Sequence, residues 1–246
     1  MQINLIELWN SMGLPVRGVV ILLSLQAIAC VAVVIDRLVL LAMSTARARA
    51  FAASVHAKME ASDYASVLGR VLETKSNHLT SYLELGIRTF LGRQAAGDGV
   101  ERAAEFTRRA LERKGDAISR DMNRGMNILA STGSTAPFVG LLGTVLGIIN
   151  AFKMISTSGS GGIGTIGAAI AEALVVTGYG LCVAIPSVLI FNSIASRIAN
   201  YEAGLINAGS ELVDRLETSG DASAAHREQA SGRKLTRSAT SVAAAG

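Results

Sequence analysis

The sequence predicts an all-α integral membrane protein with three transmembrane helices and long helices that extend into the cytoplasm. Half of its 246 residues are hydrophobic and only 17% are charged, whereas soluble domains carry about 25% charged residues. The mean hydropathy is +0.41. Aromatic residues make up only 4% of the chain, so the apolar excess consists of Ala, Leu, Ile, Val and Gly, the residues of packed helices.

Three stretches are apolar over the length of about 20 residues that a bilayer requires. These predicted spans are residues 19–41, 128–152 and 166–194. The first ends near the pair Asp36-Arg37, the second has no charged residue, and the third has one, Glu172. The leader before the first span carries Glu7 in place of a basic cluster, which argues against a cleaved signal peptide.

The positions of Lys and Arg predict the orientation of the spans. Residues 42–127 hold 14 of the 23 basic residues, and six more follow the third span. Because basic loops stay in the cytoplasm, we expect 42–127 and the C-terminus to be cytoplasmic. The N-terminal segment 1–18 and the link 153–165 are then periplasmic.

The loop between the first two spans has the periodicity of helices. One apolar stripe recurs at three- and four-residue spacing, and it consists of Leu79, Tyr82, Leu83, Gly86, Ile87 and Phe90. Oppositely charged pairs three or four residues apart follow after Val100. Since no proline interrupts this pattern before Pro137, we expect one helix over Val100–Phe152. A cytoplasmic helix over 195–217 and a disordered polar tail over 218–246 complete the chain.

The second and third spans contain small and hydroxyl residues that lipid alone would not select. The small residues that permit close helix approach are Gly140, Gly143, Gly147 and Gly180. On a helical wheel Thr144 lies on the stripe of the second span, and Thr177 lies on a similar stripe of the third. These residues either pack the helices, with each Thr bonded to its own i−4 carbonyl, or direct hydroxyls toward a functional path.

Glu172 is the only acidic residue between Asp121 and Glu202. An ionisable group in hydrocarbon costs at least about 2.5 kcal/mol, so such groups persist where they pair, face water or move ions. Two interpretations stay open for Glu172. It lies on an ion path, or it is a structural carboxyl bonded to hydroxyls or to Lys153.

The same residues argue against other classes of function. The spans contain no His and no Asp pair, as an intramembrane hydrolase would need, so we expect no catalytic residues. Cys30 and Cys182 have no CxxC spacing and the three His are scattered, so neither a metal nor a cofactor is expected. Acidic residues interleave the charged run near Arg108, so a nucleic-acid partner is not expected either.

Two long motifs resemble the MotA/TolQ/ExbB proton-channel family, on its ExbB/TolQ side. They are GSTAPFVGLLGTVLGIINAF at Gly133–Phe152 and IAEALVVTGYGLCVAIPSVLIFN at Ile170–Asn192. The pair Asp36-Arg37 also matches an acidic–Arg pair of that family, and the resemblance covers about residues 5–217. One departure is Gly178-Tyr179, where an Ala-aliphatic pair is usual, so Tyr179 is expected to add bulk near a pore.

The resemblance implies a homo-pentameric ring whose second and third spans enclose an apolar pore. An ExbD/TolR-type partner would place helices in this pore, each with one Asp, and protons would be the coupling ion. Thr144 and Thr177 would then face that Asp, and Glu172 would lie near the proton path. Pro137 and Pro186 would bend or loosen the two pore helices.

What the resemblance implies is a subunit of a proton-motive-force-driven motor in the bacterial inner membrane. The energised process would be uptake, envelope maintenance or gliding motility, which the sequence does not distinguish. A non-conducting scaffold of a membrane complex is the alternative, and it would need neither hydroxyl nor carboxyl in the spans.

Overall fold

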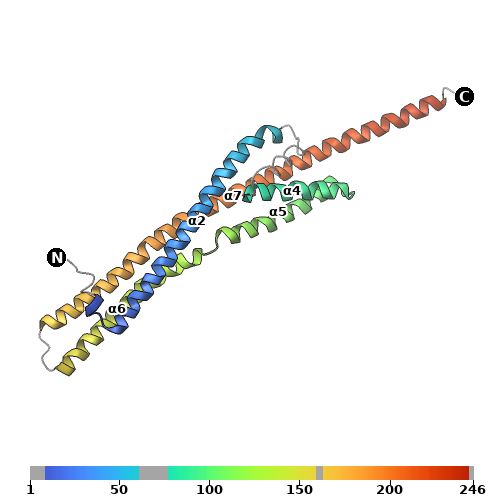
Figure 1. Ribbon diagram of the computed structural model, residues 1–246. Helices are drawn as coiled ribbons and strands as arrows, with labels where there is room; N and C mark the ends of the chain where they lie inside the picture. Colours follow the sequence, from blue (N-terminus) through green and yellow to red (C-terminus); the bar gives the residue numbers. More distant parts are fainter. Residues whose placement is uncertain (1–8, 61–76, 159–162, 244–246) are drawn as a thin grey trace. The chain divides into compact units, whose positions relative to one another are not determined.

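The computed structural model describes residues 9–60, 77–158 and 163–243. Its helices, in chain order, are α2 (Leu14–Glu60), α4 (His78–Ala95), α5 (Val100–Met122), α6 (Met126–Ser158) and α7 (Ile163–Ala243) (Figure 1). All regular secondary structure in these described residues is helical, which confirms the predicted fold class. The chain forms two compact units, which we call the membrane unit (Met1–Leu40 and Met122–Ile198) and the polar unit (Leu41–Asp121 and Ala199–Gly246).

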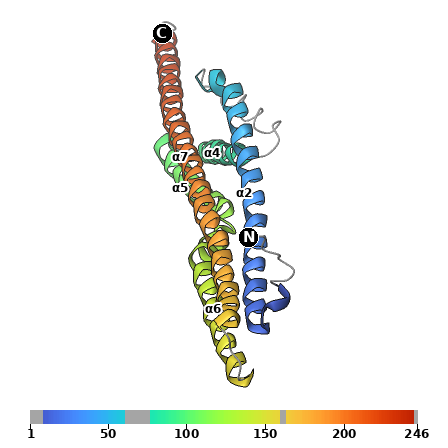
Figure 2. The same ribbon diagram turned by 90° about the vertical axis from the view of Figure 1, so that its left-hand side faces the viewer.

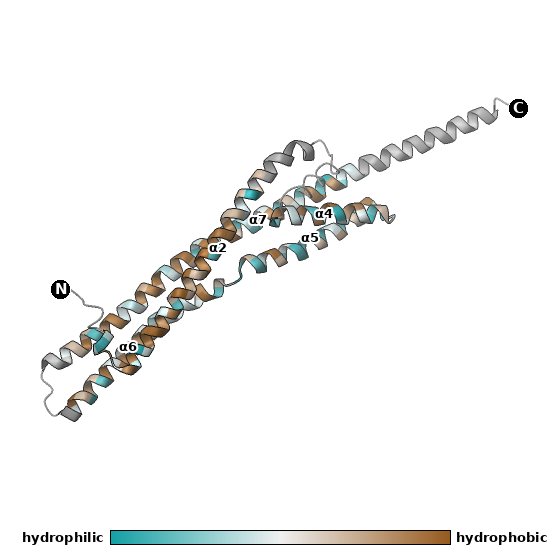
Figure 3. Cartoon of the chain, viewed as in Figure 1, coloured by the Kyte–Doolittle hydropathy of each residue, from teal (hydrophilic) through white to brown (hydrophobic). Residues whose placement is uncertain are grey.

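Three helices are long and apolar enough to cross a membrane. They include the segments Leu14–Ala48, Met126–Ser156 and Gly167–Gly220, in which an 18-residue stretch reaches a mean hydropathy of 2.7, 1.8 and 2.2, respectively. Figure 3 shows apolar residues along α2, α6 and the first part of α7. In each of these apolar stretches, no more than 28% is buried inside the chain. The predicted transmembrane helices are therefore present, and most of their apolar surface is left for lipid or for other chains.

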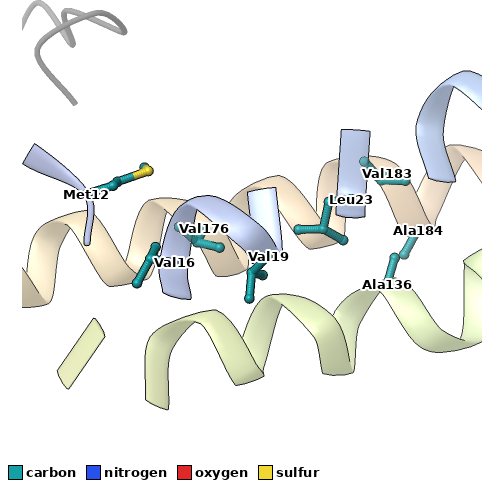
Figure 4. Close-up of a cluster of buried hydrophobic side chains, with 8 residues drawn as sticks. All are labelled: Met12, Val16, Val19, Leu23, Ala136, Val176, Val183 and Ala184. Carbon is teal, nitrogen blue, oxygen red and sulfur yellow. The ribbon is translucent and has the colours of Figure 1, made fainter. Parts of the chain in front are cut away.

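Within the membrane unit, the first part of α2 packs beside α6 and the first part of α7, as the two views in Figures 1 and 2 show. The core is a cluster of small and medium side chains from these three helices and from the turn before α2 (Figure 4). Its members are Met12, Val16, Val19, Leu23, Ala136, Val176, Val183 and Ala184. Met12 is only 6% exposed, so the turn before α2 is anchored in the core by an apolar side chain.

The prediction of one helix over Val100–Phe152 is wrong, because the chain leaves the helical conformation between α5 and α6. Gly125 has a φ of +80°, a conformation that suits glycine and ends a helix. The Arg37 guanidinium donates to the Met122 carbonyl over 3.3 Å and also pairs with Asp36. Arg37 therefore satisfies a carbonyl that the end of α5 leaves without a helical partner.

In the polar unit, α4 buries the predicted apolar stripe. All six predicted positions, from Leu79 to Phe90, are buried. Asn77 and Thr80 form a reciprocal capping box at the start of the helix, which satisfies backbone N–H groups that would otherwise lack partners. A Cβ atom at Gly86 would lie 2.8 Å from Leu212, so this glycine lets α7 approach α4 closely.

Tyr82 connects α4 to the same face of α7. Its ring is only 4% exposed, and a Cβ atom at Gly209 would lie 2.7 Å from its hydroxyl oxygen. On the outside of this unit, Arg108 of α5 reaches Glu217 of α7 at 3.4 Å, and Glu105 pairs with Arg109 one turn along α5. The second pair is one of the i,i+4 pairs that the sequence predicts.

The structure differs from the predicted disordered tail over 218–246, because α7 continues as helix to Ala243. No proline follows Pro186, so nothing forces the helix to end. Adding residues to an existing helix also avoids the unfavourable nucleation step. The polarity of a segment therefore does not by itself predict disorder when a helix leads into that segment.

We expect Gly209→Ala to lower the free energy of unfolding by about 1–3 kcal/mol, the usual cost of overpacking a core. The added methyl group would overlap the buried Tyr82 ring. Gly204 is the matched control, since a Cβ atom there meets nothing within 4 Å. Gly204→Ala should instead stabilise α7 by about 0.5–1 kcal/mol. Thermal unfolding of both variants in detergent measures the difference, and equal unfolding temperatures would contradict the described contact.

Candidate functional site

At Gly140 and Gly180 the backbones of α6 and α7 lie against each other. A Cβ atom at Gly180 would lie 2.7 Å from the Ala136 carbonyl oxygen, and one at Gly140 would lie 3.2 Å from the Thr177 Cα. Both obstacles are backbone atoms, which cannot rotate away as a side chain can. Backbone contact at this point therefore requires glycine in both helices.

The other two predicted glycines lie along the same contact. A Cβ atom at Gly143 would lie 2.5 Å from Val176, and one at Gly147 would lie 2.8 Å from Ala173. The structure thus places all four predicted glycines between two helices of the same chain.

The two threonines lie beside this contact, and each hydroxyl donates to a backbone carbonyl. Thr144 donates to the Leu141 carbonyl of its own helix over 2.6 Å. Thr177 donates across to the Gly140 carbonyl of α6 over 2.9 Å. The i−4 bond considered for both residues is therefore absent, and Thr177 forms a bond between helices that the sequence did not predict.

These bonds determine what each hydroxyl can still do. A threonine hydroxyl has one donor hydrogen and two acceptor lone pairs. With the hydrogen already used on a carbonyl, Thr144 and Thr177 can accept from a protonated carboxylic acid. They can donate to a carboxylate only after the hydroxyl rotates away from its carbonyl.

Glu172 lies at the end of the membrane unit where α6 ends and α7 begins. It is half-buried and lines a cavity of about 180 Å³. The polar side chains around this cavity are Ser11, Asn150 and Glu172. The Ser11 hydroxyl is hydrogen-bonded to the Glu172 carboxylate, and the charge of Arg17 also acts on that carboxylate.

Sequence reasoning did not find these two neighbours of Glu172. The sequence indicates hydroxyls in general and Lys153, whereas Ser11 precedes α2 and Arg17 lies in the first turn of α2, both far from Glu172 along the chain. No local spacing signals such a contact. Neither Thr144 nor Thr177 is among the described residues that line the cavity, so the structure places the carboxyl and the two hydroxyls in separate surroundings. Across the described ranges, no cluster of three His, Cys, Asp or Glu side chains suits a metal ion.

The contacts of Tyr179 within the chain are with other residues of the membrane unit. It packs against the core cluster, and its hydroxyl lies 3.0 Å from the Ser24 hydroxyl of α2. Since Ser24 donates its only hydrogen to the Val20 carbonyl over 2.8 Å, Tyr179 is the donor to Ser24. Its bulk therefore faces α2, on the side of α7 that packs in the core.

Pro137 and Pro186 lie inside α6 and α7, and both helices continue through them. Each proline lacks the N–H group that would bond the carbonyl four residues earlier. These are the carbonyls of Gly133 in α6 and Cys182 in α7. The prolines thus mark one position in each helix where the backbone ladder lacks a bond.

Comparison with known proteins places this arrangement in a family. A model of the MotA/TolQ/ExbB proton channel family matches residues 44–205, which is more than half of the chain. This range includes all of α6 and the three predicted polar residues of the site.

Individual relatives match over shorter stretches. The biopolymer transport protein ExbB of Pseudomonas putida is 41% identical over 116 residues, 47% of this chain and 34% of that protein. ExbB of Salmonella typhimurium is 39% identical over 116 residues, which is 46% of its length. The Tol-Pal system protein TolQ of Pseudomonas aeruginosa is 39% identical over 108 residues, also 46% of its length. The match thus spans a third to a half of the length of these relatives.

We expect Gly180→Ala to weaken the contact between α6 and α7, since its methyl group would overlap the Ala136 carbonyl oxygen. The loss should be about 1–3 kcal/mol, measured by thermal unfolding in detergent or lipid nanodiscs. Gly178, half a turn away on α7, meets nothing within 4 Å, so Gly178→Ala is the control and should unfold no earlier than the unmodified chain. If Gly180→Ala and Gly178→Ala unfold at the same temperature, the contact at Gly180 is not tight.

Proposed function

The chain belongs to the MotA/TolQ/ExbB proton channel family, and from this membership we propose that it is a proton-channel subunit, not an enzyme, of a proton-motive-force-driven motor in the bacterial inner membrane. The observation that carries this proposal is Glu172 in its cavity. An ionisable carboxyl at membrane depth costs free energy. A carboxyl there that borders a space open to water can bind and release protons.

We further propose that the subunit works with an ExbD/TolR-type partner that carries an Asp in a single membrane helix. The relatives are named for biopolymer transport and for the Tol-Pal system. These names support a role in energising uptake or envelope maintenance, and gliding motility is a third process that such a motor could drive. The distribution of Lys and Arg supports a periplasmic N-terminus and a cytoplasmic C-terminus. The Glu172 cavity would then open on the periplasmic side, where protons enter.

Thr144 and Thr177 suggest how the partner Asp would be recognised. With their hydrogens on the carbonyls of Leu141 and Gly140, both hydroxyls can accept from the protonated Asp, but each must give up its bond to the carbonyl before it can donate to the ionised Asp. The bundle would therefore bind the neutral partner Asp more tightly than the ionised one. Proton arrival and departure would thereby change how the partner helix is held.

A non-conducting scaffold is the second candidate, and one observation favours it. Both threonine hydroxyls already have backbone partners, as a purely structural residue would. Reconstitution into liposomes with and without an ExbD/TolR-type partner distinguishes the two candidates. Our proposal predicts proton uptake that is driven by an imposed gradient and requires both proteins, whereas a scaffold would give no uptake in either case.

We expect Thr144→Val and Thr177→Val to reduce this gradient-driven proton uptake by at least about tenfold, the rate equivalent of losing one hydrogen bond to the transferring group. Valine keeps the volume and loses the hydroxyl. Thr144→Ser and Thr177→Ser are the matched controls and should retain most of the uptake. If both valine variants take up protons at the unmodified rate, the hydroxyls only pack the helices.

We expect the chain to assemble as a homo-pentamer, as the family resemblance implies, and large apolar side chains such as Leu25, Phe138 and Leu189 are exposed on α2, α6 and α7 for contact with other subunits or lipid. Native mass spectrometry of the protein released from detergent measures the subunit number. A pentamer peak that persists at low protein concentration is the expected result. A spectrum of monomers and dimers alone would contradict the ring.

A further inference from the structure

The turn before α2 brings a serine hydroxyl to the carboxyl of Glu172. Ser11 is exposed while Glu172 is half-buried, and the Ser11 hydroxyl is hydrogen-bonded to the Glu172 carboxylate. Both residues line the same cavity of about 180 Å³. A space of this size admits water, which needs only about 10–15 Å³. The serine hydroxyl and the carboxyl therefore both border a space that water can enter.

Three contacts hold this turn in place. The Met12 side chain is buried in the core of the membrane unit, where Figure 4 shows it at one end of the cluster near Val16. The Arg17 guanidinium donates to the Asn10 carbonyl over 3.0 Å and lies over the Trp9 ring at 5.6 Å. Ser11 is thus held on one side by the buried Met12 side chain and on the other by the contacts of Arg17 with Trp9 and Asn10.

The turn also fits closely against the end of α6. A Cβ atom at Gly13 would lie 3.0 Å from the Asn150 side-chain amide, and Asn150 lines the cavity beside Glu172. Hence the N-terminal turn, α6 and α7 each contribute one polar side chain to this cavity. This convergence of three separate segments distinguishes the site from a chance surface contact.

We propose that Ser11 is a positioning and relay residue for Glu172, through which protons from the outer solution reach the carboxyl. This inference rests on the proposed function. A hydronium ion in the cavity gives a proton to the Ser11 oxygen while the Ser11 hydroxyl proton passes to the Glu172 carboxylate. Water remains in the cavity, Ser11 keeps one hydrogen, and Glu172 becomes neutral. Arg17 holds the turn and balances the charge of the ionised carboxylate.

The test compares three substitutions in the full chain, reconstituted in liposomes with its ExbD/TolR-type partner. Ser11→Ala removes the hydroxyl and should lower gradient-driven proton uptake by about tenfold, equivalent to one lost hydrogen bond to a charged group. Ser11→Thr keeps the hydroxyl and should restore the rate. Ser156→Ala is the matched control, because Ser156 is an exposed serine near the end of α6 whose hydroxyl donates to the Lys153 carbonyl.

Thermal unfolding of each variant separates the relay from a structural role. We expect Ser11→Ala to unfold at the unmodified temperature while its uptake falls. Proton uptake at the unmodified rate in Ser11→Ala would overturn the inference. So would low uptake in Ser11→Thr, or a loss of uptake in Ser11→Ala that is matched by a lower unfolding temperature. Absence of proton uptake by the unmodified pair would instead contradict the proposed function itself.

Discussion

The membrane unit depends on one backbone contact, in which Gly140 of α6 meets Gly180 of α7. A Cβ atom at Gly180 would collide with the backbone of α6, and one at Gly140 would press against the backbone of α7 at 3.2 Å. Without a hydrophobic driving force between helices in lipid, close packing and interhelical hydrogen bonds must hold them together. The bond from Thr177 to the Gly140 carbonyl lies at this contact, so the same glycine both permits the approach and accepts the bond.

From this contact the polar groups of the unit are distributed along α7 in two directions. On the side that faces α2, Tyr179 donates to Ser24. Toward the start of the helix, Glu172 is hydrogen-bonded to Ser11, which precedes α2, and the charge of Arg17 in the first turn of α2 acts on it. The carboxyl is thereby kept apart from the two threonines. Proton entry and recognition of a partner carboxyl would thus be carried out by different residues of one rigid helix pair.

Much of this arrangement follows from the sequence because it rests on local periodicity. The three apolar spans and the buried stripe of α4 need only hydropathy and helical spacing. The small residues of α6 and α7 also predict close helix packing. The break at Gly125 was missed because a single glycine in a helical pattern does not show whether its φ is positive. The helical continuation to Ala243 was missed because polarity alone does not end a helix.

The partners of the polar residues could not be predicted for a different physical reason. Ser11 reaches Glu172, and Ser24 reaches Tyr179, only after the first span packs against α7. Such contacts depend on the rotation of each helix about its axis, which core packing around Leu23 and Val176 decides. The hydropathy of a span restricts that rotation very little when most of its surface faces lipid.

The most direct test of the central claim is infrared difference spectroscopy of the full chain in lipid, recorded between acidic and alkaline buffer. The account holds that Glu172 is a titrating carboxyl inside the membrane unit. It predicts a carbonyl band of a protonated carboxylic acid that disappears in Glu172→Gln and persists in Glu202→Gln, which changes a carboxyl of the polar unit. A spectrum that Glu172→Gln leaves unchanged would contradict the account.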